Sequence, residues 1–164
     1  MSDFIGPNVY TVVTRLVDKR LDLDGGKKED GTKLQLLYTI PESRRPTNEH
    51  KPFDNTQYGP NQRFVFAHVG DDEYLIINDR SGTYLTASDD NSQITGNLIS
   101  PLEKRVRWKI EPVKDRSGSY FIFSVAFPKK VIDIKIATGI EDRSAVYTLP
   151  HDGAKNQQFF LRSA

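Results

Sequence analysis

The chain has 164 residues, with 23 basic and 22 acidic side chains, a formal net charge of +1 and no cysteine. This length is enough for one domain with a buried core, the balanced charge argues against nucleic-acid binding, and the lack of cysteine excludes disulfides and thiolate chemistry. No window approaches the roughly 18 apolar residues of a membrane helix, and the first residues lack the apolar stretch of a secretory signal. We therefore expect a protein that does not insert into membranes and is cytoplasmic, or is released without a signal peptide.

Short runs rich in Tyr, Val, Ile and Phe predict β-strands along the chain, and no stretch predicts a long amphipathic helix. In the first third of the chain the predicted strands are 9–14, 20–25, 34–41 and 61–67. The segment 42–60 is long, polar and contains prolines, which is typical of a surface loop.

The same four-strand pattern then recurs twice. The second set of strands is predicted at 73–78, 83–88, 93–101 and 105–112, and the third at 119–124, 131–136, 144–150 and 156–163. Three such units, over roughly 8–70, 71–115 and 116–164, predict an all-β fold, the β-trefoil, in which six strands close a barrel and six cap one end. We expect one such domain over residues 1–164.

Units one and three share a polar set that unit two lacks. The set is an Asp on the second strand, a Tyr in a repeated Tyr-Thr-x-Pro motif and an Asn in a repeated Asn-Gln-x-Phe motif: Asp22, Tyr38 and Asn61 in unit one, Asp133, Tyr147 and Asn156 in unit three. At the matching places unit two has Thr86, roughly Leu98 and Arg105. Because the strand pattern of unit two survives without this set, we interpret the set as a binding site and not as scaffold.

The chemistry of this set fits a sugar. A carboxylate accepts hydrogen bonds from neighbouring hydroxyls, and an Asn amide offers one acceptor and two donors to the same hydroxyls. An aromatic ring packs against the apolar C–H face of a hexose. The set therefore predicts recognition of a monosaccharide without a reaction, so we expect no enzyme activity.

These residues resemble the ricin B-chain type of lectin, whose three tandem units repeat Gln-x-Trp or Gln-x-Phe, and the resemblance covers essentially the whole chain. Unit two, from 73 to 112, is similar to the Sclerotinia-type fungal agglutinins, which lack cysteine and have about this length. The resemblance implies binding of galactose or N-acetylgalactosamine, with the Asp on the 3- and 4-hydroxyls, the aromatic ring as stacking platform and the Asn on the 3-hydroxyl. It also implies a place for His151 beside the unit-three site, and a structural role for Gln62 and Gln157.

Which unit binds stays open at this point. The Sclerotinia-type resemblance implies binding by unit one, but the 42–60 loop separates Tyr38 from Asn61 there, whereas unit three keeps the shorter spacing. Read alone, Asp133 is an outward strand charge paired with Lys135. Agglutination would need two sites per particle, which favours a homodimer.

An inhibitor of proteinases is the alternative function, because cysteine-free β-trefoils of this size also serve as fungal inhibitors. The 42–60 loop, with Arg44, Arg45 and Lys51, is the candidate bait. We expect no metal or cofactor, because the histidines His50, His68 and His151 are scattered and no cysteine accompanies them.

Overall fold

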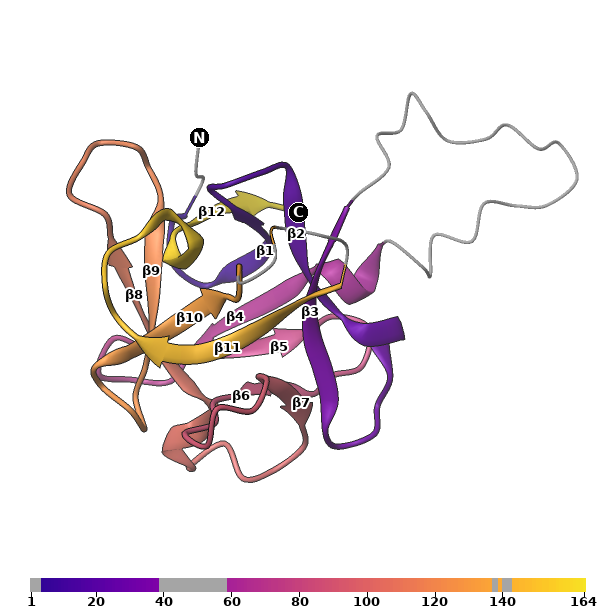
Figure 1. Ribbon diagram of the computed structural model, residues 1–164. Coiled ribbons are helices and arrows are strands. Elements are labelled where there is room, and N and C mark those ends of the chain that lie inside the picture. The colour runs from indigo at the N-terminus through magenta and orange to yellow at the C-terminus, as the bar shows by residue number, and fades with distance from the viewer. Residues whose placement is uncertain (1–3, 39–58, 137–138, 140–142) are drawn as a thin grey trace, which may run out of the picture.

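The computed structural model describes residues 4–38, 59–136, 139 and 143–164. These residues form twelve β-strands and a few short 3-10 turns, and no α-helix occurs among them (Figure 1). Nor does this part of the chain contain a helix long and apolar enough to cross a membrane. Each unit contributes four strands, which confirms the predicted β-trefoil.

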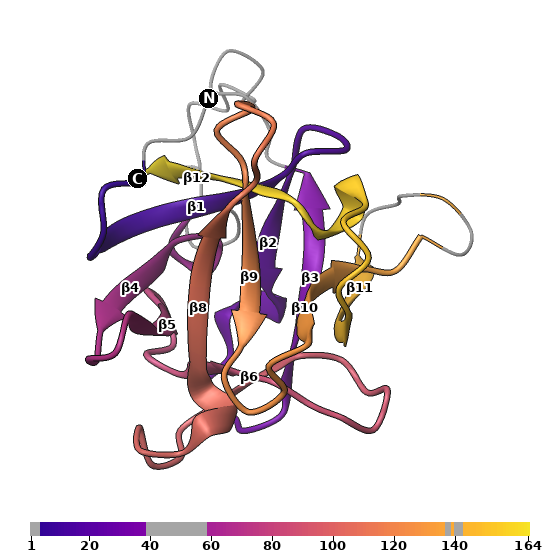
Figure 2. The same cartoon turned by 90° about the vertical axis from the view of Figure 1, so that its left-hand side faces the viewer.

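Six of the strands close a barrel. They are β1 (Asn8–Thr14), β4 (Phe64–His68), β5 (Glu73–Asn78), β8 (Arg107–Pro112), β9 (Tyr120–Ser124) and β12 (Phe159–Ser163). Each pairs antiparallel with the next in this order, and β12 pairs with β1, so the ring is complete. Figure 2 shows β8 and β9 side by side in the barrel wall. Closure leaves no barrel strand with an unpaired edge that could add a foreign strand.

The other six strands form three hairpins. These are β2 (Lys19–Leu23) with β3 (Thr32–Tyr38), β6 (Tyr84–Thr86) with β7 (Thr95–Asn97), and β10 (Lys130–Ile134) with β11 (Ser144–Pro150). Where they meet, Leu34 N donates to Ile94 O and Ile94 N donates to Val146 O, each at 2.9 Å. All three of these residues are fully buried. Their meeting point marks the pseudo-threefold axis.

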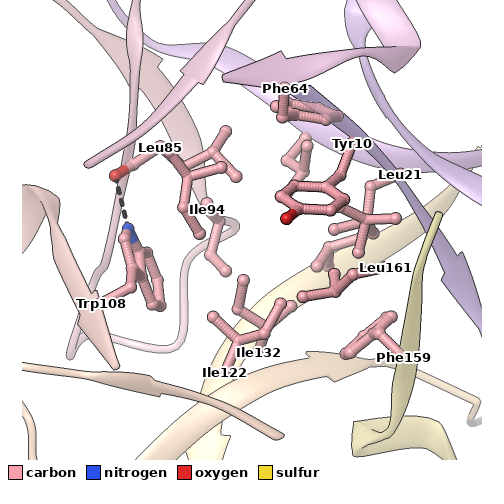
Figure 3. Close-up of a cluster of buried hydrophobic side chains, with 14 of the residues drawn as sticks. Tyr10, Leu21, Phe64, Leu85, Ile94, Trp108, Ile122, Ile132, Phe159 and Leu161 are labelled. Carbon is pink, nitrogen blue, oxygen red and sulfur yellow. Dashed lines mark hydrogen bonds between the residues drawn. The ribbon is translucent and has the colours of Figure 1, made fainter. Parts of the chain in front are cut away.

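The core is one cluster of buried side chains contributed by barrel strands and hairpins, and Figure 3 shows a part of it. Each unit places a buried aromatic residue in its fourth strand, two residues after the short 3-10 turn that precedes the strand: Phe64, Trp108 and Phe159. Trp108 brings an N–H into this apolar core, and its Nε1 donates to Leu85 O at 3.0 Å. A buried indole N–H needs such an acceptor. Because Leu85 O supplies it, unit two has Trp where the other units have Phe without leaving a buried polar group unpaired.

The Asn-Gln pairs do not begin the fourth strands as predicted. They lie in 3-10 turns just before those strands, η3 (Pro60–Gln62) in unit one and η5 (Lys155–Gln157) in unit three. Unit two has the equivalent turn η4 (Lys104–Val106). A tight turn at this place carries the amide side chains out of the barrel strand and brings them to the second strand of the same unit.

Candidate functional site

Asp133 on β10 is the centre of the unit-three site. Asn156 Nδ2 donates to its Oδ1 at 3.0 Å and Gln157 Nε2 donates to its Oδ2 at 2.7 Å. Burial raises the pKa of Asp133 above its ordinary value, and these two hydrogen bonds partly offset that effect. A carboxylate has about four acceptor positions. The two hydrogen bonds from side-chain amides therefore orient the group and leave acceptor capacity for ligand hydroxyls.

Gln157 has the structural role that the resemblance implies. Besides Asp133, its buried amide donates from Nε2 to Pro150 O at 2.9 Å. Its Oε1 accepts from the backbone N–H of Asp152 and of Gly153, at 3.0 and 3.2 Å. One side chain thus connects β10, the end of β11 and the following loop, and all of its hydrogen-bonding capacity is used inside the protein.

Tyr147 lies directly opposite Asp133 in the β10–β11 register. Its ring is half-buried, and Lys135 Nζ lies 5.1 Å from the ring centroid, a cation–π contact. The alternative that made Asp133 an outward charge paired with Lys135 is therefore wrong: Asp133 is only 5% exposed and is bound by amides, while Lys135 contacts the tyrosine.

Asn156 and His151 differ in how they relate to this centre. Asn156 is half-buried and donates to both Asp133 and Ile134 O, the second at 3.3 Å. His151 is exposed, and its ring packs edge-on against Phe121 at a centroid distance of 4.5 Å. Within the described part of the chain the imidazole makes no hydrogen bond, so the Asp133 network does not include it.

Unit one contains the same kind of carboxylate, but it is held by one more amide. Gln35 Nε2 donates to Asp22 Oδ1 at 3.1 Å, and Asn61 Nδ2 and Gln62 Nε2 donate to Asp22 Oδ2 at 2.9 and 3.0 Å. Asp22 is only 1% exposed, and burial raises its pKa to about 6 in spite of these bonds. Three donors use most of the acceptor capacity that unit three leaves open.

The hairpin register corrects one part of the sequence interpretation. Asp22 faces Gln35 across β2–β3, whereas Tyr38 faces Lys19 three residues further along the strand. Tyr38 is therefore the counterpart of Pro150, which faces Lys130 in unit three, and not of Tyr147. The two Tyr-Thr-x-Pro motifs look alike in sequence but occupy different positions, and the side chain of Tyr38 lies outside the described part of the structure.

The same register places Thr95, not Leu98, opposite Thr86 in unit two.

Gln35 is the site residue that sequence reasoning missed. Residues on two strands of an antiparallel hairpin pair when they lie equally far from the turn, so counting outward from the turn would have matched Gln35 with Asp22. The Tyr-Thr-x-Pro motif points instead to Tyr38, three positions from Gln35.

The two Asn residues differ in access. Asn61 is 1% exposed, and its Oδ1 is buried with no hydrogen-bond partner, whereas Asn156 is half-buried. Of the two carboxylate sites, that of unit three thus combines a ring opposite the carboxylate with an Asn side chain that is partly exposed. Arg44, Arg45 and Lys51, the bait residues of the inhibitor alternative, lie outside the described residues. Among the described residues, no three His, Cys, Asp or Glu side chains come close enough together to hold a metal ion.

Comparison with known proteins shows which family the chain is similar to. Residues 60–149 match the family model described as ricin-type beta-trefoil lectin domain-like. An agglutinin of Sclerotinia sclerotiorum is 37% identical over 124 residues, which cover 74% of this chain and 72% of the agglutinin. The crystal structure of the Rhizoctonia solani agglutinin superposes with a TM-score of 0.76 at 18% identity, covering all of both chains.

A second solved structure, the C-half of the earthworm R-type lectin in complex with GalNAc, superposes with a TM-score of 0.68 at 20% identity and covers 96% of this chain and 100% of that one. At these identities the structural matches establish the shared fold, while the family model and the Sclerotinia relative establish descent. The chain belongs to the ricin-type β-trefoil lectin family. It is accordingly a carbohydrate-binding protein of the agglutinin kind and not an enzyme.

Proposed function

We propose that this lectin binds terminal galactose or N-acetylgalactosamine, and that the unit-three site is its principal site. One observation carries the proposal: Asp133 is oriented by Asn156 and Gln157, keeps free acceptor capacity and faces the half-exposed ring of Tyr147. Adjacent hydroxyls on one edge of a sugar ring match a fixed carboxylate and an Asn amide, and the apolar face of galactose matches an aromatic ring.

The choice of sugar has support from one related structure. The structure of the earthworm R-type lectin domain, which has the same fold, is that of a complex with GalNAc.

Lys135 affects how a sugar can stack on Tyr147, because its ammonium already lies over the ring. A bound sugar would either use the other face of the ring or displace Lys135 from this one.

Titration calorimetry with galactose and with N-acetylgalactosamine tests the proposal. Asp133→Ala removes a charge-assisted acceptor, and we expect it to weaken binding about ten- to hundredfold, equivalent to about 1.5–3 kcal/mol. Tyr147→Ala removes the stacking ring and should weaken binding as well. Tyr84→Ala is a matched control, because it removes another half-buried tyrosine from a hairpin in unit two and should leave binding unchanged.

Asp22→Ala distinguishes the two units. Each Ala variant needs a circular dichroism spectrum and a melting curve beside the titration, so that lost binding is not confused with lost folding. Unchanged binding in folded Asp133→Ala together with complete loss in folded Asp22→Ala would make unit one the site. If neither sugar bound to the parent protein, the lectin would recognise another glycan.

Agglutination follows from the same proposal only with more than one site per particle. A single shallow sugar site binds weakly, with a dissociation constant on the order of 1 mM, and linked sites gain affinity without new contacts. We propose a twofold homodimer, the commonest symmetric assembly. Analytical ultracentrifugation at the concentration used for red-cell agglutination tests it, and a strict monomer that still agglutinates would contradict it.

A further inference from the structure

Unit two has a pocket at the place where units one and three hold their carboxylates. The pocket has a volume of about 270 Å³, and its lining includes Thr86 and Arg105. Thr86 has the hairpin position of Asp22 and Asp133. Arg105 has the position of Asn61 and Asn156 in the 3-10 turn. The other two units have at this place a carboxylate that accepts hydrogen bonds from side-chain amides, whereas unit two has an open cavity.

A third position completes the comparison, and it comes from the neighbouring hairpin. Thr95, opposite Thr86, is paired on its other side with Lys33 of β3. In unit one the residue at this third position is Ala145, which pairs with Gln35. In unit three it is Gln93, which pairs with Tyr147. Lys33 also lines the pocket. Unit two is therefore the unit in which this position carries a charge.

The three differences change the charge of the site in one direction. A carboxylate is replaced by Thr86, an amide by the guanidinium of Arg105, and a neutral neighbour by the ammonium of Lys33. No acidic residue is among those that line the pocket. The charged side chains that line the unit-two pocket are thus Lys33 and Arg105, both cations, and Arg105 is paired with Glu103 at 2.9 Å just outside the lining. A cationic lining favours a different ligand from the one that a carboxylate such as Asp133 favours.

The two cations have hydrogen-bonding capacity to spare. Glu103 Oε2 accepts from Arg105 Nε and Nη2 at 3.2 and 2.9 Å, and Nη1 makes no hydrogen bond within the described part of the chain. The ammonium of Lys33 has no ion pair or hydrogen bond among the described residues either, and the side chain is exposed. An unpaired ammonium and a guanidinium together are suited to a carboxylate or a sulfate.

The rest of the lining suits a polyhydroxyl ligand. Gln93 and Thr95 offer an amide and a hydroxyl, beside a small apolar surface. The hydroxyls of Thr86 and Ser88 already donate to Tyr84 O and Asp90 Oδ1, so they offer acceptor capacity only. The volume lies just below the roughly 300–1,000 Å³ of pockets that take drug-sized ligands, which is the size for one sugar ring. We propose that unit two binds an acidic saccharide, a sugar whose carboxylate or sulfate contacts Lys33 and Arg105 while its hydroxyls contact the polar lining.

The test compares ligands that differ in a single group. Methyl glucuronide and methyl glucoside differ by a carboxylate, and glucose 6-sulfate tests the sulfate form of the same chemistry. In two-dimensional NMR of the ¹⁵N-labelled protein, the acidic sugars should shift the backbone amides of Gln93, Thr95 and Asn97, and the glucoside should not. The shifts should diminish as salt rises from about 0.02 M to about 0.5 M, because salt screens exposed charges.

Two charge variants locate the site. Lys33→Gln should weaken binding of the acidic sugar about two- to fivefold, the range for an exposed charge pair. Lys114→Gln is the matched control: it makes the same charge change at an exposed lysine between β8 and β9, at the far end of these strands from the hairpins (Figure 2), and it should bind like the parent. Equal shifts with glucoside and glucuronide, or equal weakening by both variants, would overturn the proposal. Inorganic sulfate binding as tightly as glucose 6-sulfate would overturn its saccharide part.

Discussion

Gln35 Nε2 donates a 3.1 Å hydrogen bond to Asp22 Oδ1 from directly across the β2–β3 hairpin. The same place in the β10–β11 hairpin is occupied by Tyr147, opposite Asp133. In unit one the opposite residue satisfies the carboxylate, and in unit three it presents a ring beside it. Two units that share an Asp and an Asn-Gln pair thus differ in the residue opposite the carboxylate, which adds a third hydrogen bond in unit one and an aromatic ring in unit three.

Gln35→Ala should destabilise the protein by about 1–3 kcal/mol. The change removes one of three donors from a buried carboxylate, and a buried charge that loses a partner bears a desolvation cost that the other two bonds do not cover. Urea unfolding at neutral pH measures the effect. Lys33→Gln on the same strand is the control and should lie within about 0.5 kcal/mol of the parent, because the Lys33 side chain is exposed. Equal stability of the two variants would mean that the Gln35 bond contributes nothing.

The stability of the protein should decrease as pH rises between about 4 and 6. The pKa of Asp22 is raised to about 6 by burial, so the folded state holds this proton more tightly than the unfolded chain does. The stabilisation from the protonated group is complete below the unfolded pKa of about 4 and is lost as pH rises through 6, a change of about 3 kcal/mol.

Unfolding free energies of Asp22→Asn over the same pH range isolate this effect. Asn cannot ionise, so the slope should become shallower whatever the absolute stability of the variant. Part of the slope should remain, because burial raises the pKa of Asp133 as well. Asp90 acts in the opposite sense and mainly below this range, because its pKa in the folded state is lowered to about 2. An unchanged slope in Asp22→Asn would contradict the prediction.

Sugar binding should also weaken in mild acid, by a different route. Asp133 accepts hydroxyl hydrogen bonds in its ionised form, and burial raises its pKa, so the acceptor is lost at a higher pH than an ordinary aspartate would require. We expect the affinity for galactose, measured by calorimetry, to fall as the pH is lowered from 7 toward 4.5. An affinity that is constant over this interval would show that Asp133 does not bind the sugar as a carboxylate.

Asp133 and Gln157 should be energetically coupled. Asp133→Thr and Gln157→Val introduce the residues that unit two has at the same places, Thr86 and Val106. Each single change leaves a buried polar partner unsatisfied and should cost about 2–4 kcal/mol, whereas the double change removes both ends of the 2.7 Å bond. The double variant should therefore be more stable than the sum of the singles implies, by about 1–2 kcal/mol. Additive costs in a double-mutant cycle would mean that the two residues act separately.

Much of the fold could be read from the sequence because it depends on local patterns. Alternation of apolar residues every second position follows from the geometry of a strand, and its threefold recurrence is typical of a trefoil. The Asp and Asn-Gln positions were also found, because two units keep them and unit two, with Thr86 and Arg105, does not. These features need no knowledge of which strands are neighbours.

The tertiary structure decided what depends on contacts between strands. The hairpin register made Gln35 the partner of Asp22 and placed Tyr38 elsewhere, and the fold turned Asp133 inward to its amides and away from Lys135. Lys33 lies far from Thr95 in the chain, yet β3 and β7 bring them together at the unit-two pocket. Repetition in a sequence reports which residues are alike, whereas burial and pairing are relations in space, and only the closed barrel with its three hairpins determines those.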